Sequence, residues 1–459
     1  MYLPPSAIST SVEQPFLTAG QVPGDMNLPI SRIFTWLIAI SIGFLFFGFF
    51  QENLTVNNWT TFSMNFEALT SKQDYKENIT RRTTLNALVT ELERSTENVS
   101  APGIDPNTPM PILFRSNFSK LPVWDFEDVY NQDGPASTMC QQSLRNSTDE
   151  TFKKAFLPKI RLFLHKNNLN MSEWNRLSHF NNPFGFMDYS YNDVMSSVKL
   201  IPEPKEPLLS PKAGSDGCIR CAVVGTAGIL NGSKMGKEID AHDYVFRMNG
   251  AVTTGYEDDV GNRTSVYVHT AHSITTSLYL FKKYGYKSAP HDEGIKYVMI
   301  PEGMRDFQWL QGLLRGERVQ LGPYKNKRPR TYYSSQYNES RFYVLHQDFL
   351  RYVRNRFLKS PNLNKRYWAI VRPTNGAFAL FLALHTCDIV DAYGFMTRDY
   401  AKYSNYYFQR HDKSRVVFYA NHDYILEMKT WEKLHNSKIM RLYQSGRELP
   451  SKNITGKNA

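Results

Sequence analysis

The feature that most constrains the fold is an alternation of short apolar runs and helical patterns from Cys218 onward. Cys221–Val224 is a run of the kind that forms a buried strand, and Gly225 and Gly228 follow it as a turn. A second run, Tyr244–Met248, comes at the distance typical of a βαβ unit. Such units hold nucleotides, but the two glycines match neither the dinucleotide nor the Walker motif. By itself the stretch is more simply explained as a strand and a tight turn.

The alternation continues through most of the remaining chain. Strands are predicted at Cys221–Val224, Tyr244–Arg247, Ser265–Val268, Lys296–Ile300, Tyr367–Val371, Ile389–Tyr393 and Val416–Tyr419. Helices are predicted at Phe152–His165, Tyr189–Lys199, Ile274–Tyr284, Arg305–Arg315, Gln347–Phe357, Gly376–Thr386 and Ile425–Leu434. This pattern predicts an α/β fold with a mostly parallel sheet and helices on both faces.

Charged residues inside this region suggest exposed surfaces rather than sites. Phe349 to Lys359 carries four basic residues along one side, which is typical of a solvated helix face. Glu257, Asp258 and Asp259 form an acidic cluster, interpreted as an exposed turn.

An uncharged run precedes the globular part of the 459-residue chain. Residues 33–51 contain no charged side chain, and nineteen helical residues rise about 28 Å, close to the hydrocarbon thickness of a bilayer. The run ends in bulky residues unsuited to signal cleavage, so an uncleaved signal-anchor is predicted. The predicted organisation is a cytoplasmic tail at 1–32, the anchor at 33–51, a luminal stem at 52–135, a globular domain at 136–450 and a C-terminal tail at 451–459.

Charge and cysteine content narrow the function classes. The net charge of +11 is compatible with nucleic acid, membrane surfaces or anionic substrates, and the lack of basic blocks makes nucleic acid the weakest of these. The four cysteines are Cys140, Cys218, Cys221 and Cys387. Cys218 and Cys221 could form half of a zinc site, but no second close pair exists, and a luminal location favours disulfides.

A second informative stretch begins at Thr374. Thr374 and Asn375 suit a helix N-cap, and Gly376 lets backbone approach a ligand. The helix that follows is almost wholly apolar, so its N-terminus is expected at the edge of the core. Free amides at such an end suit an anion such as phosphate, although a capped core helix explains the pattern equally well.

A third stretch contains His422 and Glu427. His422 follows the apolar run Val416–Tyr419, a position where α/β active sites lie, and histidine is a natural base near neutral pH. The spacing to Glu427 is not that of a zinc-binding pair, and a cap or packing role is the simpler alternative for a single histidine. No G-x-S-x-G elbow and no Asp-x-Asp metal motif occurs in the sequence.

These stretches, in this order, resemble the sialylmotifs of animal sialyltransferases. Cys221–Ser265 resembles the large motif, Pro373–Phe395 the small motif, Tyr406–Gln409 the third, and His422 with Glu427 the very small motif. Three further segments look closest to the α-N-acetylgalactosaminide α-2,6-sialyltransferases of mucin-type O-glycans, namely Asn182–Met187, Ile239–Phe246 and Trp431–His435.

The resemblance implies a modified GT-A-like, Rossmann-type fold, with 136–450 as the catalytic domain of a single-pass type II Golgi membrane protein. It implies CMP-sialic acid as donor and the 6-hydroxyl of GalNAc on Ser or Thr of glycoproteins as acceptor. The family inverts the anomeric carbon by direct displacement, without a metal or other cofactor.

The resemblance also implies roles for individual residues. His422 would accept the acceptor proton. The CMP part would contact Gly225, Thr226, Gly228, Asn249, Thr374, Asn375, Gly376 and Tyr406. Cys140 would pair with Cys218 and Cys221 with Cys387.

Two departures from the family pattern leave alternatives open. Thr226 stands where many relatives have Asn, and Tyr406 and Gln409 stand where many have His and an acidic residue. Tyrosine can donate a hydrogen bond but does not titrate near pH 7. The alternatives are a sialyltransferase of another linkage or acceptor, such as α-2,3 or α-2,8, and a Golgi-anchored binding protein without catalysis.

Overall fold

A computed structural model describes residues 107–133, 138–204, 207–412 and 414–446. The predicted tail, the anchor at 33–51 and most of the stem lie outside these residues, as does the C-terminal tail. Among the described residues, no helix combines the length and the apolar character needed to span a membrane.

The centre of the fold is a seven-stranded sheet in which all neighbouring strands are parallel. The strands are β1 (Arg220–Val224), β2 (Tyr244–Met248), β3 (Val266–His269), β4 (Lys296–Met299), β5 (Phe342–Val344), β6 (Ile389–Tyr393) and β7 (Arg441–Leu442). Their order across the sheet is β5-β4-β3-β2-β1-β6-β7. The chain therefore builds outward from β1 to β5 and then crosses to the other side of β1. The expectation of a mostly parallel α/β sheet is confirmed.

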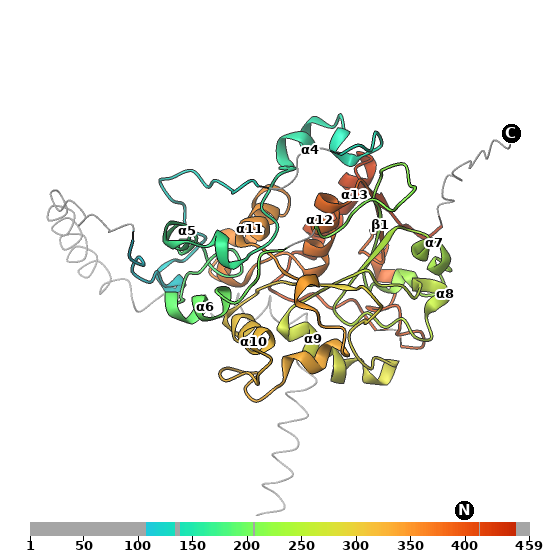
Figure 1. Ribbon diagram of the computed structural model, residues 1–459. Helices are drawn as coiled ribbons and strands as arrows, with labels where there is room; N and C mark the ends of the chain where they lie inside the picture. The colour runs from blue at the N-terminus through green and yellow to red at the C-terminus, as the bar shows by residue number, and fades with distance from the viewer. Residues whose placement is uncertain (1–106, 134–137, 205–206, 413, 447–459) are drawn as a thin grey trace, which may run out of the picture. The chain divides into compact units, whose positions relative to one another are not determined.

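Helices cover both faces of this sheet (Figure 1). They are α4 (Glu150–Ala155), α5 (Met171–Leu177), α6 (Tyr191–Val198), α7 (Gly236–Asp240), α8 (Glu257–Val260), α9 (Ala271–Leu280), α10 (Met304–Arg315), α11 (Gln347–Arg356), α12 (Asn375–Thr386) and α13 (Tyr424–Asn436). Figure 1 shows α11 and α12 on one side of the sheet and α9 and α10 on the other.

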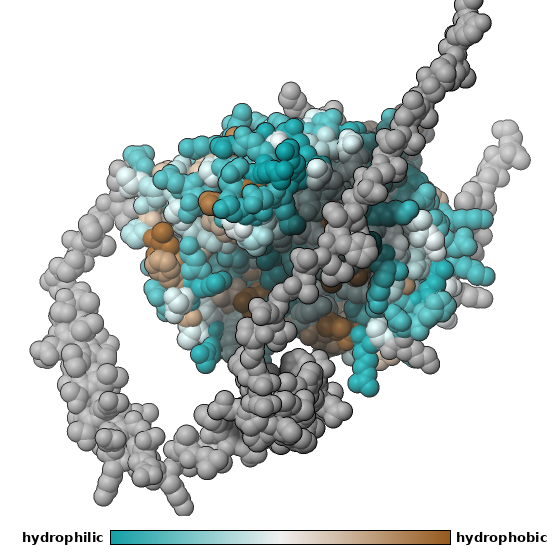
Figure 2. Space-filling view, turned by 90° about the horizontal axis from the view of Figure 1, so that it is seen from below, coloured by the Kyte–Doolittle hydropathy of each residue, from teal (hydrophilic) through white to brown (hydrophobic). Residues whose placement is uncertain are grey.

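The alternation of side chains along β1 explains the two layers. Cys221 and Val223 pack in the core that contains α12, whereas Ala222 and Val224 pack in the core that contains Ile239 of α7. Helix α12 is apolar on all sides, and a helix of this kind is expected in the core. Its residues from Ala377 to Leu384 are all buried. The outer surface differs from this core: the face in Figure 2 is largely hydrophilic, with apolar residues in a few separate patches.

Three predicted elements are wrong. Tyr367–Val371 is not a strand but contains a short 3-10 helix at Trp368–Ile370. Val416–Tyr419 belongs to no helix or strand and pairs with no described strand. The predicted helix at Phe152–His165 ends after Ala155, because Pro158 cannot continue it. Strands β5 and β7 were not predicted, because they contain only three and two residues, respectively, and so short a segment shows no clear hydrophobic pattern.

Only half of the basic face predicted at Phe349–Lys359 is solvated: Arg356 and Lys359 are exposed, whereas Arg351 and Arg354 are buried. Arg351 is fully buried, forms ion pairs with Asp348 and Asp128, and stacks over the Phe180 ring. Arg354 is 2% exposed and lies over the ring of Phe184 at 4.0 Å. The prediction failed for these two arginines because Asp128, Phe180 and Phe184 come from distant parts of the chain.

The acidic cluster is only partly exposed: Glu257 and Asp258 are exposed as predicted, whereas Asp259 is not. It forms helix α8, and Asp259 is buried, where its carboxylate accepts hydrogen bonds from the amides of Gly232 and Lys234. An ion pair with Arg410 adds a second restraint. Asp259 therefore holds the loop after β1 in place.

Two disulfides join segments that are far apart in the sequence. Cys140 is bonded to Cys218, and Cys221 in β1 is bonded to Cys387 at the end of α12. No described cysteine is free. The pairing that the sequence resemblance implies is thus confirmed, and the second bond fixes α12 directly to the central strand.

Candidate active site

A cavity of about 540 Å³ opens at the carboxyl ends of the strands. Residues that follow β1, β2, β3, β4 and β6 contribute to its wall, for example Gly225, Asn249, Thr270, Glu302 and Gly394. The strand order changes direction between β1 and β6, and parallel sheets bind ligands at such a switch point.

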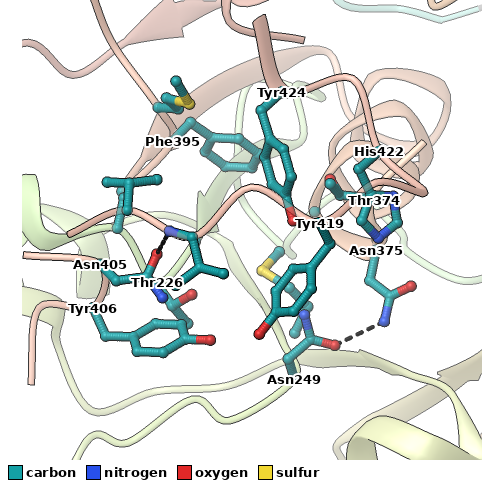
Figure 3. A pocket seen from close by; sticks show the side chains of 18 of the residues that line it. Thr226, Asn249, Thr374, Asn375, Phe395, Asn405, Tyr406, Tyr419, His422 and Tyr424 are labelled. Atoms are coloured by element: carbon teal, nitrogen blue, oxygen red, sulfur yellow. Dashed lines mark hydrogen bonds between the residues drawn. The ribbon is translucent and has the colours of Figure 1, made fainter. Parts of the chain in front are cut away.

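The structure brings all the site residues expected from the sequence to this one cavity. Its wall includes Gly225, Thr226, Gly228, Asn249, Thr374, Asn375, Gly376, Tyr406 and His422. Figure 3 shows six of these side chains around the cavity, together with Asn405, Tyr419 and Tyr424. Residues more than 190 positions apart in the chain are therefore neighbours in one site.

Asn249 and Asn375 connect the end of β2 to the start of α12. The Asn375 amide nitrogen donates to the Asn249 side-chain oxygen at 2.8 Å (Figure 3). Asn249 has a φ of 53°, a left-handed conformation that asparagine tolerates better than most residues. The turn after β2 thereby directs a side-chain amide toward the helix end, which fixes both groups in the cavity wall.

Thr374 and Glu427 fix the N-terminus of α12. The Thr374 hydroxyl caps the helix by accepting from the amide of Ala377 at 3.1 Å. The same hydroxyl and the Thr374 amide both donate to the carboxylate of Glu427, at 2.8 and 2.7 Å. Burial raises the pKa of Glu427 to about 7. Glu427 is thus a positioning residue for the helix end, because its carboxylate is occupied by Thr374.

The Asn375 and Gly376 amides at this helix end are available for a ligand. Neither forms a hydrogen bond with another residue that the structure describes. A twelve-residue helix begins here, so its dipole adds a partial positive charge at the cavity. This end of α12 is suited to a phosphate group.

His422 lies in the loop before α13, where its ring is held in one orientation. Its Nδ1 lies 2.8 Å from the carbonyl oxygen of Arg372, which can only accept, so Nδ1 carries the proton. Nε2 is then the basic nitrogen, and it lies 3.3 Å from the side-chain amide of Asn421. Burial lowers the pKa of His422 to about 4, so the ring is neutral at pH 7 and able to accept a proton.

Glycine occupies the three glycine positions of the site for different physical reasons. A Cβ on Gly225 would lie 2.4 Å from the Gly394 carbonyl oxygen, and one on Gly228 would lie 2.0 Å from that of Ser404. Close packing of the chain therefore accounts for these two. A Cβ on Gly376 would meet nothing closer than 3.5 Å. Only at Gly376 does the protein itself leave room for a side chain.

Tyr406 forms part of the wall opposite α12. It stacks on Phe408 and packs edge-on against Phe281, and burial raises its pKa. Its amide donates to the side-chain oxygen of Gln409 at 3.1 Å. Gln409 thus acts here as a brace for the Tyr406 turn.

Glu302, Arg305 and Arg372 line the cavity but were not predicted as site residues from the sequence. Glu302, two positions beyond the strand prediction Lys296–Ile300, binds Arg372 through both Nε and the terminal nitrogen and also pairs with Arg305. Both arginines line the cavity, which places two cations around one carboxylate. The strand-end position of Glu302 was a usable signal, whereas the partnership with Arg372 depends on the fold.

Metal ligands do not cluster in the described residues. No group of three or more His, Cys, Asp or Glu side chains there could hold a metal ion.

Comparison with known proteins places the chain among sialyltransferases. Residues 163–439, more than half of the chain, match glycosyltransferase family 29 (sialyltransferase). The α-N-acetylgalactosaminide α-2,6-sialyltransferase 1 of Gallus gallus is 46% identical over 343 residues, which cover 72% of this chain and 60% of that protein. The α-N-acetylgalactosaminide α-2,6-sialyltransferase 2 of Mus musculus is 42% identical over 318 residues, which cover 68% of this chain and 85% of that protein.

A solved structure agrees with the fold. The crystal structure of a mammalian sialyltransferase matches with a TM-score of 0.50 and 22% identity, covering 67% of this chain and 99% of that chain. At this identity the match concerns the fold alone. The chain spans 60% of the length of the chicken relative.

Proposed function

Because the chain belongs to glycosyltransferase family 29, the sialyltransferases, we propose that it transfers sialic acid from CMP-sialic acid to the 6-hydroxyl of GalNAc on Ser or Thr. The names of relatives at 46% and 42% identity support the acceptor and the linkage. One structural observation carries the proposal: a neutral histidine and a helix N-terminus with free amides line the same cavity.

His422 accepts the proton of the acceptor hydroxyl in this proposal. The bond from Nδ1 to the Arg372 carbonyl leaves Nε2 as the acceptor, and the hydroxyl replaces the weak contact with Asn421. The oxygen then attacks the anomeric carbon from the face opposite the phosphate, with inversion. A pKa near 4 describes the cavity without ligand, and an anionic donor raises it toward the range of an effective base.

The leaving CMP carries the developing negative charge. The amides of Asn375 and Gly376 and the positive end of the α12 dipole stabilise this charge, and the Tyr406 hydroxyl adds a donor. Thr226, Asn249 and the turn after β1 bind the rest of the nucleotide. These groups replace a metal in the proposal, so we expect excess EDTA to leave the turnover rate unchanged; a rate restored only by divalent cations would contradict this.

The N-terminal sequence supports a proposal for the cellular setting. We propose a single-pass type II protein of the Golgi membrane, anchored through residues 33–51, with the cavity in the lumen. Two disulfides in the described residues are in keeping with an oxidising compartment.

The direct test supplies CMP-sialic acid and a peptide carrying GalNAc on threonine, and measures CMP release and the linkage of the product. We expect an α-2,6-linked product. An α-2,3 or α-2,8 product would favour the alternative of another sialyltransferase specificity. CMP binding without turnover on any acceptor would favour the non-catalytic alternative, which Thr226 and Tyr406 motivate.

A further inference from the structure

The segment Ser414–Tyr419 has the sequence of a strand and is not part of the sheet. Its β-branched and aromatic residues predict a strand, but residues 414–419 belong to no helix, strand or turn. Within residues 414–418, no main-chain N–H or C=O forms a backbone–backbone hydrogen bond with another described residue. A strand-like segment with unpaired main-chain groups is a template for pairing with a second chain.

This segment is held in place although it has no strand partner. The Val417 amide donates to the side chain of Asn405 at 3.3 Å, and the Ser414 hydroxyl accepts from the Asn405 amide at 3.1 Å. The same hydroxyl donates to the side chain of Gln409. These side-chain contacts fix the conformation of the segment in advance, which lowers the entropic penalty of binding a partner.

The segment also forms part of the mouth of the cavity. Val416, Val417 and Tyr419 line the cavity, and Tyr419 is seen among its side chains in Figure 3. Val417, Phe418 and Tyr419 are 45%, 47% and 56% exposed, although all three are apolar or aromatic. Phe418 packs edge-on against Tyr400 and Tyr424, which both line the cavity. The apolar surface and the cavity are therefore continuous.

We propose that Ser414–Tyr419 binds the polypeptide of the glycosylated acceptor as an added strand. This inference rests on the proposed function, in which the reacting sugar is attached to Ser or Thr. A sugar inside the cavity leaves its polypeptide one sugar ring away, at the mouth, where these residues lie. The main-chain groups of residues 414–418 bind the peptide backbone, except the Val417 amide, which already donates to Asn405. Val417, Phe418 and Tyr419 contact alternate side chains of the peptide. The segment thus selects protein-linked GalNAc over free glycosides.

The test compares two acceptors with the same sugar, a GalNAc-threonine peptide and GalNAc linked to a methyl group. The variant Phe418→Ser removes the apolar contact between the Phe418 ring and the peptide. We therefore expect kcat/KM for the peptide to fall about tenfold relative to kcat/KM for the methyl glycoside, and we expect the fall to come from KM. Leu321→Ser is the matched control, since Leu321 is 65% exposed and lies outside the cavity wall. An unchanged ratio in Phe418→Ser, or an equal fall in the control, would overturn the inference.

A second measurement tests the strand pairing itself. Acceptor peptides are N-methylated at one residue at a time, which removes one main-chain donor without changing the sugar. Strand pairing predicts KM increases that recur at every second residue. Losses without this period, or none, would exclude strand pairing. If no GalNAc acceptor of either kind reacts, the proposed function fails together with the inference, whereas activity on both with unchanged ratios refutes the inference alone.

Discussion

At the scale of single residues, the structure separates groups that sustain the fold from groups that can act on a ligand. Gly225 and Gly228 are explained by contacts with the backbone of Gly394 and Ser404. Gly376 has no such contact, and the neighbouring amides are free among the described residues. The sequence showed that all three are glycines beside apolar segments, but only the fold shows which one has room for a side chain.

Gly376 therefore provides a test of ligand binding without loss of folding. We expect the free energy of unfolding of Gly376→Ala to differ from that of the parent chain by less than about 1 kcal/mol, because the added Cβ makes only ordinary contacts. The methyl group projects where the phosphate is proposed to bind, so KM for CMP-sialic acid should rise about tenfold or more. Donor titration and urea unfolding measure the two effects.

Gly225→Ala is the control variant, for which we expect a clear loss of stability. Its Cβ would lie 2.4 Å from a backbone oxygen that cannot rotate away, so a loss of stability of about 1–3 kcal/mol is expected. An equal loss of stability in the two variants would contradict the distinction between these glycines.

At the scale of elements, the sequence was reliable where hydrophobic pattern decides and unreliable where a distant partner decides. Strands β1, β2, β3, β4 and β6 were predicted within one residue or so of their bounds. Val416–Tyr419 has an equally good strand pattern, but no described strand lies beside it. A strand forms only where a neighbouring strand is available for pairing, and the local sequence does not show whether one is. The burial of Arg351 was missed for the same reason, since Asp128 lies 223 positions away.

Glu302 couples the end of β4 to the loop that holds His422. Its carboxylate binds the Arg372 side chain, and the Arg372 carbonyl accepts from the His422 ring. The negative charge of Glu302 raises the pKa of His422, while burial and the charge of Arg372 lower it. Glu302 is therefore a positioning residue that acts on His422 through Arg372.

Glu302→Gln tests this coupling through the pH profile. Only neutral His422 can accept a proton, so activity falls as pH falls through its pKa, about 4 in the cavity without ligand. Loss of the Glu302 charge lowers that pKa further, so the acid limb of the kcat/KM profile should move to lower pH, while kcat falls because the base is weaker.

The control for this variant is Glu432→Gln. Glu432 is half-buried, forms an ion pair with the exposed Arg398 side chain and does not line the cavity. We expect its pH profile to match that of the parent chain. An acid limb that stays in place in Glu302→Gln, or that moves equally in the control, would show that Glu302 does not act on His422.

At the scale of the whole molecule, residues 107–133 belong with the globular part by their contacts. Asp128 pairs with Arg351 and accepts from Asn355, and the indole of Trp368 donates to the Phe118 carbonyl. We propose that the folded unit includes residues 107–133, so that its boundary with the stem lies on the N-terminal side of the predicted residue 136. Composition could not locate this boundary, because the segment has the polar and proline-containing character of a stem.

Asp128→Asn measures the importance of this segment. The variant leaves fully buried Arg351 with Asp348 as its one remaining carboxylate, so a loss of about 1–3 kcal/mol in the free energy of unfolding is expected. Asp125→Asn, at an exposed position, should change stability by less than about 0.5 kcal/mol. Equal stability of the two variants would assign residues 107–133 to the stem.

The central claim is that His422 accepts the acceptor proton in the cavity at the carboxyl edge of the sheet. The most direct measurement compares the parent chain with His422→Ala, following CMP-sialic acid binding and α-2,6 transfer to a GalNAc peptide in the same preparations. We predict donor binding within about threefold and a fall in kcat of about 10²–10⁴-fold. Near-normal turnover in His422→Ala would contradict the account.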